Sequence, residues 1–146
     1  MTEDQSTEHG NDRNTGRSTG RRDEYGTEGK ELVLTCLELY GKGDLDAVAP
    51  LLRDDYVDHG LPFRTRTKAD WMAVARQLPL AEMRFDIRRL VAEGDYVTMF
   101  SRRWLPGGAL DIAVADVFRL QDSLIAERWE VVEPIPADAP NPVAAL

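Results

Sequence analysis

The stretch that decides the fold is residues 112–132, IAVADVFRLQDSLIAERWEVV, which predicts a β-hairpin. On its first arm Ile112, Val114, Phe118 and Leu120 alternate with other residues, so they share one face of a strand. Asp116 falls on that same apolar face. A buried carboxylate needs an ion pair, a hydrogen-bonded network or a chemical role, because burying it alone costs roughly several kcal/mol. Asp116 is therefore the first candidate functional residue.

The length of the turn decides what lies opposite Asp116. A three-residue loop over 121–123 places Asp116 opposite Arg128, which makes a cross-strand ion pair. A two-residue turn at Asp122 and Ser123 places it opposite Trp129 instead. Desolvation against that aromatic ring would then raise the pKa of the carboxyl. The sequence leaves both registers open.

The composition of the chain disfavours several classes of function. The net charge of −8 and pI of about 4.8 disfavour a nucleic-acid partner and an anionic membrane surface. One cysteine and two histidines give no zinc-finger spacing. No apolar run approaches the roughly 18 residues of a transmembrane helix, and the N-terminus lacks the apolar core of a secretory signal. We expect a soluble cytoplasmic protein.

The chain divides at about residue 30. Residues 1–29 are polar and charged, with one aromatic residue, so we expect a disordered N-terminal extension. Residues 30–146 form the predicted domain. Helical spacing follows over 30–40, after Asp44, and after Thr67, where the Asp and the Thr can cap the helices. A short strand with Tyr56 and Val57 lies between the second and third helices and delivers His59 to a loop.

After residue 82 the spacing of apolar residues changes to two, which indicates strands over 82–93 and 96–105 before the hairpin. The predicted fold is α+β: three helices gathered on one face of a curved antiparallel sheet, forming a cone-shaped barrel with a single pocket. On the third and fourth strands the outward face is predicted to be apolar, which favours a homodimer. Its members are Val97, Met99, Leu105, Ala113, Ala115 and Val117.

Three motifs carry a resemblance to a known family. They are YVDH at 56–59, EGDYV at 93–97 and DVFRLQDSLIAERWEVVEPIP at 116–136. Together they resemble the SnoaL-like polyketide cyclase group of the nuclear-transport-factor-2-like superfamily, over about residues 30–142. That group reads Glu-His-Trp-Asp where this chain has Glu127-Arg128-Trp129-Glu130, so Arg128 replaces a histidine. A second histidine of the group is absent, and Phe100 lies near its place.

The resemblance implies a cone-shaped barrel, usually a homodimer, with a deep pocket and no metal or other cofactor. In that group a pocket aspartate and histidine close rings by intramolecular aldol chemistry, as part of polyketide secondary metabolism. By motif position Asp116 resembles the catalytic aspartate, and His59 resembles the catalytic histidine. The superfamily also contains isomerases, dehydratases, epoxide hydrolases and binding domains, so the fold alone does not fix the function.

Three functions follow as hypotheses. The first is a cofactor-free lyase, isomerase or cyclase, in which Asp116 takes a proton from a carbonyl substrate and His59 donates to its oxygen. The second is an epoxide-opening hydrolase or cyclase, which needs two carboxylates bridged by an arginine, here Asp116, Glu127 or Glu130, and Arg128. The third is a non-catalytic, dimeric ligand-binding module. In each case the partner is a small hydrophobic molecule, and the predicted contacts are Tyr56, Phe100, Trp104, Phe118, Arg128 and Trp129.

Overall fold

The structure is a computed structural model that describes residues 16–60, 64–138 and 140. Three α-helices and two short 3-10 turns precede or interrupt the strands. They are α1 (Gly16–Lys42), α2 (Leu45–Val48), η1 (Ala49–Leu51), α3 (Lys68–Ala75) and η2 (Leu80–Glu82). The helix α1 begins inside the segment that the sequence predicts to be disordered, so the predicted boundary at residue 30 falls within a helix. Residues 1–15 lie outside the described part of the chain.

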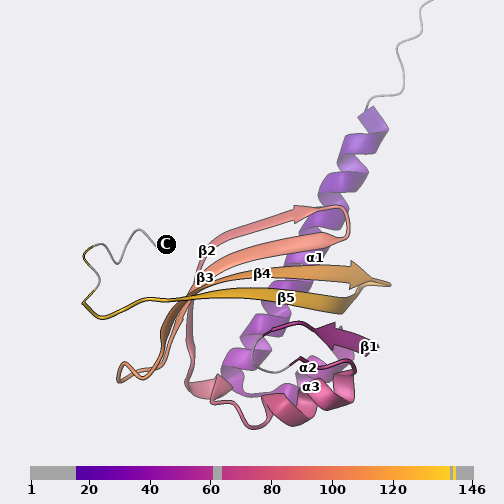
Figure 1. The fold of residues 1–146 in the computed structure, drawn as a ribbon. Helices are drawn as coiled ribbons and strands as arrows, with labels where there is room; N and C mark the ends of the chain where they lie inside the picture. The colour runs from indigo at the N-terminus through magenta and orange to yellow at the C-terminus, as the bar shows by residue number, and fades with distance from the viewer. Residues whose placement is uncertain (1–15, 61–63, 139, 141–146) are drawn as a thin grey trace, which may run out of the picture.

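Five strands form one sheet in the order β1-β5-β4-β3-β2. They are β1 (Leu52–Asp58), β2 (Arg84–Glu93), β3 (Tyr96–Trp104), β4 (Asp111–Gln121) and β5 (Leu124–Pro134). The strands β2 to β5 form the predicted antiparallel meander, and β1 joins the edge of β5 in parallel. The sheet curves, with α1 along one side and α2 and α3 near β1 (Figure 1). This is the predicted α+β cone, with a mixed sheet that does not close.

The predicted helix caps are present. The side chain of Asp44 accepts a hydrogen bond from the N–H of Ala47 at the start of α2, and Thr67 accepts one from Asp70 at the start of α3. Pro50 ends the second helix early, because α2 gives way there to the 3-10 turn η1.

The β4–β5 hairpin has neither of the two predicted registers. Asp122 and Ser123 form a two-residue turn with φ of 54° and 59°, the left-handed geometry of a tight hairpin turn. A β-bulge then follows: Leu120 pairs with Ile125, but Arg119 pairs with Glu127. The extra residue shifts every later pair, so Asp116 lies opposite Glu130. Two carboxylates are therefore neighbours on the inner face of the sheet.

The face assigned to part of β3 is wrong. Val97 and Met99 pair with Phe118 and Asp116 on the inner face and are 1% and 0% exposed, whereas the sequence suggests an outward position. Phe100 alternates with them and so points outward. Both faces of this strand carry large apolar residues among polar ones, so alternation alone cannot show which face is buried.

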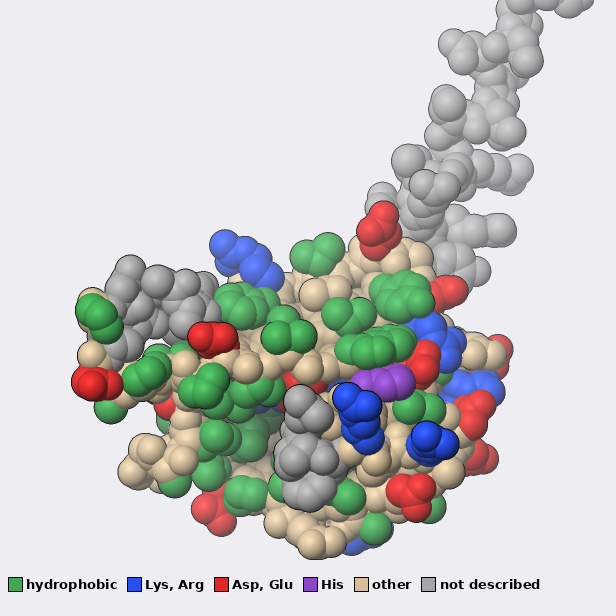
Figure 2. All heavy atoms as spheres, in the orientation of Figure 1, with side chains coloured by type: hydrophobic (Ala, Val, Ile, Leu, Met, Phe, Trp, Pro, Cys, Tyr) green, Lys and Arg blue, Asp and Glu red, His purple; other side chains and the backbone are tan. Residues whose placement is uncertain are grey.

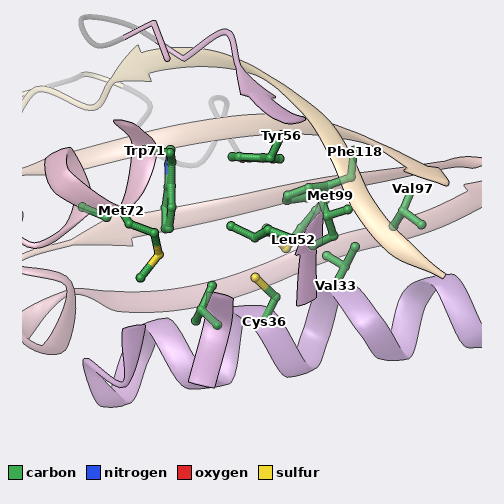
Figure 3. Packing of buried hydrophobic residues seen from close by; sticks show 12 residues of the cluster. Val33, Cys36, Leu52, Tyr56, Trp71, Met72, Val97, Met99 and Phe118 are labelled. Carbon is green, nitrogen blue, oxygen red and sulfur yellow. The ribbon is translucent and has the colours of Figure 1, made fainter. Parts of the chain in front are cut away.

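The hydrophobic core lies between α1 and the inner face of the sheet (Figure 3). The helix contributes Val33 and Cys36, and the sheet contributes Leu52, Met99 and Phe118. Trp71 of α3 packs edge-on against Tyr56, with ring centroids 5.9 Å apart. This packing fixes α3 over the end of the sheet and leaves a space beside it.

Candidate functional site

A cavity of about 180 Å³ lies between α1, α3 and the inner face of the sheet. Most of its wall is apolar, whereas a smaller part is charged. The apolar lining comprises Val33, Cys36, Leu37, Tyr40, Trp71, Val74, Leu78, Leu80, Met83, Phe85, Met99 and Phe118. A cavity with apolar walls and a few convergent polar groups is the usual form of a small-molecule site.

The charged part of the wall is one connected cluster, called here the carboxylate–arginine cluster. Asp58, Arg103, Arg128 and Glu130 line the cavity. Asp116 joins them from behind: it is 0% exposed and does not line the cavity. The five side chains come from four strands, so only the folded sheet brings them together.

The strand β1 places Asp58 beside Arg128, because the two residues pair across the parallel β1–β5 ladder. Arg128 Nε lies 3.1 Å from Asp58 Oδ2, and Arg128 Nη2 lies 3.4 Å from Oδ1. The Tyr56 hydroxyl donates to Oδ2 at 3.0 Å, and the N–H of Gly60 donates to Oδ1 at 2.7 Å. Each oxygen of Asp58 therefore faces two donors.

The buried Asp116 holds both arginines. Arg103 Nη2 donates to Asp116 Oδ2, and Arg128 Nη1 lies 3.6 Å from Oδ1. Arg103 Nη1 also donates to Glu130 Oε1 at 3.1 Å, and its Nε donates to Ser101 at 3.3 Å. Arg103 thus bridges the two carboxylates that the bulge made neighbours. A bridging guanidinium fixes the relative position of both groups.

The backbone of Gly60, just after β1, lies close against the cluster. A Cβ at this position would lie 2.8 Å from Asp58 Oδ1, 2.9 Å from Arg128 Nη2 and 2.9 Å from Glu130 Oε2. Three polar atoms therefore converge on the backbone of Gly60. A side chain here would displace groups that hold one another by hydrogen bonds.

The pKa of the Glu130 carboxyl is raised above its usual range. Burial raises the pKa of its carboxyl above the usual range, and the charges of Asp116 and Asp58 raise it further, against the lowering effect of the two arginines. The cluster holds three carboxyl groups and two guanidinium groups, so its charges balance when Glu130 is protonated. The nearest donors are Arg103, bonded to Oε1, and Arg128, 3.4 Å from Oε2.

Cys36 lines the cavity without being a nucleophile. Burial raises the pKa of its thiol to about 12. It is therefore a neutral thiol at ordinary pH, and only the thiolate is nucleophilic.

The structure brings together some of the predicted site residues. Phe118 and Arg128 line the cavity. Tyr56 is 1% exposed and reaches the cluster through Asp58. Asp116 belongs to the cluster but is separated from the cavity by the residues in front of it. Its catalytic role stays a prediction.

The other predicted residues lie outside the cavity. His59 stacks on Trp129 with ring centroids 4.9 Å apart and an interplanar angle of 4°. Trp129 pairs with Val117, on the face opposite to Asp116. His59 Nε2 lies 3.3 Å from Glu127 Oε1, away from the cluster. Phe100 and Trp104 also alternate with inward residues of β3, so none of the four lines the cavity.

Sequence reasoning missed Arg103 and Asp58. Asp58 lies two residues after Tyr56, so alternation along β1 could have placed both on one face. Arg103 lies on the same alternation as Val97 and Met99, which the sequence predicts to face outward. In both cases the sequence shows a charged residue on the same strand face as large apolar residues, which is the signal for a buried functional group.

The described residues contain no group of three or more His, Cys, Asp or Glu side chains placed to hold a metal ion. None of the helices in the described ranges is long and apolar enough to cross a membrane.

Residues 33–128 match the sequence model of the SnoaL-like domain. The chain belongs to this family. The match contains Asp58, Arg103, Asp116 and Arg128, and it ends two residues before Glu130. Comparison with curated proteins gives no match.

Several solved structures share the fold of this SnoaL-like protein. A putative ketosteroid isomerase from Kribbella flavida is 16% identical, with a TM-score of 0.68 over 86% of this chain and 91% of that one. An epoxide hydrolase from M. tuberculosis, described as LEH-like, is 23% identical, with a TM-score of 0.62 over 75% and 85% of the chains. AclR, a putative hydroxylase from Streptomyces galilaeus, is 18% identical, with a TM-score of 0.60 over 73% and 90%. At these identities the likeness shows the fold alone.

Proposed function

We propose that this chain is a cofactor-free isomerase, lyase or cyclase that moves a proton on a small apolar carbonyl compound. Glu130 is the acid/base group. The observation that carries the proposal is the position of Glu130: it lines an apolar cavity, has a raised pKa, and lies between two guanidinium groups that also line the cavity. A carboxyl whose pKa is shifted toward neutrality is suited to both accept and return a proton.

The reaction begins at a C–H bond next to the carbonyl group. The ionised Glu130 takes this proton, and the electron pair of the broken C–H bond moves onto the carbonyl oxygen to give an enolate. Arg103 and Arg128 are the donors available to stabilise the developing negative charge. Protonated Glu130 then returns its proton to another carbon, which isomerises the substrate. In a cyclase the enolate carbon attacks a second carbonyl instead, and the proton goes to the new alkoxide.

This assignment moves the proton-transfer role from Asp116 to Glu130. Asp116 is held by both arginines and lies outside the cavity wall. His59 lies on the outer face of the sheet, so the donors to the oxygen become the two arginines. The proposed mechanism still uses a positioned base and a nearby hydrogen-bond donor, but different residues supply them.

Epoxide opening is the second candidate, favoured by the bridge that Arg128 makes between Asp58 and Glu130. Protonated Glu130 would give its proton to the epoxide oxygen as the C–O bond breaks. Water would attack the carbon and lose its proton to Asp58. We place this reaction second because the oxygens of Asp58 already accept from Tyr56, Gly60 and Arg128.

The test compares Glu130→Gln with Glu127→Gln. Glu127 is a matched control because it lies three residues earlier on the opposite face of β5, paired with Arg119 and His59 outside the cavity. The probes are a β,γ-unsaturated cyclic ketone, whose shift to the conjugated enone is followed by absorbance, and cyclohexene oxide, whose diol is measured. Glu130→Gln should lower the rate of isomerisation by about 10²–10⁴-fold, the usual contribution of a positioned acid/base group.

Glu127→Gln should keep its rate. Isomerisation that survives Glu130→Gln contradicts the assignment. Diol formation without isomerisation makes epoxide opening the function. If the wild-type protein turns over neither probe but binds them, the ligand-binding module is favoured.

A further inference from the structure

We propose that the substrate is a compact, uncharged compound of a single ring, bound with its oxygen at Arg103 and Arg128 and its hydrocarbon part against α1 and α3. That the oxygen belongs to a carbonyl group rests on the proposed function above. The limit on the size and charge of the ligand rests on the cavity alone and does not depend on the proposed function.

The volume of the cavity sets the size limit. An engineered protein cavity of about 150 Å³ is filled by benzene, whereas drug-sized ligands occupy pockets of roughly 300–1,000 Å³. The present cavity of about 180 Å³ is close to the smaller figure. One ring with short substituents fits inside it, whereas a fused three- or four-ring polyketide would extend beyond it.

The walls cannot move apart at little cost. Val33 and Met99 line the cavity and are 1% and 0% exposed, and Phe118 is 7% exposed. Each is also part of the hydrophobic core between α1 and the sheet. Because packed cores resist changes in volume, a larger ligand would have to separate α1 from the sheet.

The distribution of polarity orients the ligand. The side chains from α1 and α3 that line the cavity are apolar apart from the Tyr40 hydroxyl, the thiol of Cys36 and the ring N–H of Trp71. The ionisable groups of the wall that carry charge all come from the carboxylate–arginine cluster on the sheet. A ligand with one oxygen therefore satisfies the cavity when its oxygen meets the cluster and its carbon atoms meet the helices.

The charge of the cluster excludes an anionic ligand. Two guanidinium groups face two aspartates and Glu130, so no positive charge remains unbalanced, whether Glu130 is protonated or ionised. A carboxylate or phosphate would bring an additional negative charge into a buried site without a free counter-ion, which is costly. The whole chain, with a net charge of −8, adds no attraction for anions.

The experiment measures binding separately from turnover. The probes are cyclohexenone, with one ring, anthrone, with three fused rings, and cyclohexane carboxylate, an anion of one ring. The readout is the rise in melting temperature of the full chain over a range of probe concentrations. We expect cyclohexenone to bind at least about tenfold more tightly than the other two, a difference within the usual discrimination of a shaped pocket.

A variant that fills the cavity supplies the matched control. Val74 lines the cavity on α3, whereas Val131 of β5 is 70% exposed. Val74→Phe should weaken binding of cyclohexenone by about tenfold or more, whereas Val131→Phe should leave it unchanged. If circular dichroism shows that Val74→Phe is unfolded, Leu80→Phe is measured in its place, because Leu80 lines the same cavity.

Binding of anthrone or cyclohexane carboxylate as tight as that of cyclohexenone overturns the inference. So does binding that neither Val74→Phe nor Leu80→Phe weakens. The failure of the proposed function looks different. In that case cyclohexenone still binds with the expected selectivity, but Glu130→Gln leaves proton transfer unchanged.

Discussion

At the scale of single residues, two neighbouring glutamates of β5 have opposite electrostatic environments. Burial raises the pKa of the Glu130 carboxyl, while the hydrogen bond from Arg119 lowers that of Glu127. The two residues are three positions apart in the regular part of β5 that follows the bulge. They therefore lie on opposite faces of the strand. The same chemical group therefore favours its protonated form on the inner face and its ionised form on the outer face.

These shifts predict opposite effects on stability. The raised pKa of Glu130 means that the folded state favours the protonated form, so its contribution is complete at low pH and is lost as pH rises through the folded pKa. Glu130→Gln should therefore raise the melting temperature at pH 8 relative to wild type, with the difference vanishing near about pH 4, the range of an unperturbed glutamate.

Glu127→Gln should show the reverse. Its lowered pKa contributes stability above the ordinary value for glutamate, and this contribution is lost as pH falls through the lower folded value. The variant should melt below wild type at pH 8 and approach it in acid. Thermal melts of the three proteins between pH 3 and 9 measure both signs. Two curves that run in parallel would contradict the assigned environments.

Asp116 lies against both buried arginines, and these contacts predict the effect of its replacement. Asp116→Asn would leave Arg103 and Arg128 with one negative charge fewer at a site that is 0% exposed. Removing one partner from a buried charge cluster costs about 3–5 kcal/mol. Urea unfolding should show a loss of this size, and activity per folded molecule should fall less than in Glu130→Gln.

A matched control is Asp111→Asn. Asp111 also pairs with an arginine of β3, but its side chain is 27% exposed and that of Arg102 is 37% exposed. A partly exposed pair contributes at most about 1 kcal/mol. If the two variants lose equal free energies of unfolding, the contribution of Asp116 to stability does not come from its burial. Full stability of Asp116→Asn with lost turnover would return Asp116 to a catalytic role.

At the scale of elements, the sequence predicts where the helices and strands lie better than how the strands are paired. Asp44 and Thr67 are caps with recognisable spacing, and both cap helices in the structure. The inner position of Asp116 follows from simple alternation with Val114 and Phe118. Local signals of this kind need no knowledge of the rest of the chain.

The alternation of apolar residues does not predict the positions of the β-bulges. One extra residue in β5, Ala126, lies between the Leu120–Ile125 pair and the Arg119–Glu127 pair. It brings Glu130, and not Arg128 or Trp129, opposite Asp116. A second irregularity between Ile87 and Arg89 in β2 turns Val91 outward, where it is 59% exposed. A bulge inverts every later side chain, and no residue type marks its position in this sequence. The sequence therefore predicts which strands carry the candidate site, but not which of their residues face the cavity.

At the scale of the whole molecule, the outer face of the sheet still carries many apolar side chains after these corrections. Val97 and Met99 leave the predicted outward set, and others replace them. The apolar residues that alternate outward include Phe100, Trp104, Ala115, Val117, Trp129 and Val131, among charged residues such as Arg102, Arg119 and Glu133. Hydrophobic side chains gather over the sheet on the face that Figure 2 shows. Contiguous apolar surface of this kind marks an interaction site on a folded protein.

We propose that a second copy of the chain covers this face, forming the homodimer expected from the sequence. Val131 is the most exposed apolar residue of the face, at 70%. Val131→Asp would place a charge on the face that the second copy is proposed to cover, and charged residues in an interface shift the equilibrium toward the monomer. Leu34→Asp is the control, because Leu34 is 40% exposed on α1, away from the sheet. Light scattering should give twice the chain mass of 16.4 kDa for wild type and Leu34→Asp, and the single mass for Val131→Asp. A wild-type protein that scatters as one chain at micromolar concentration would rule out the dimer and leave the outer face to a different partner.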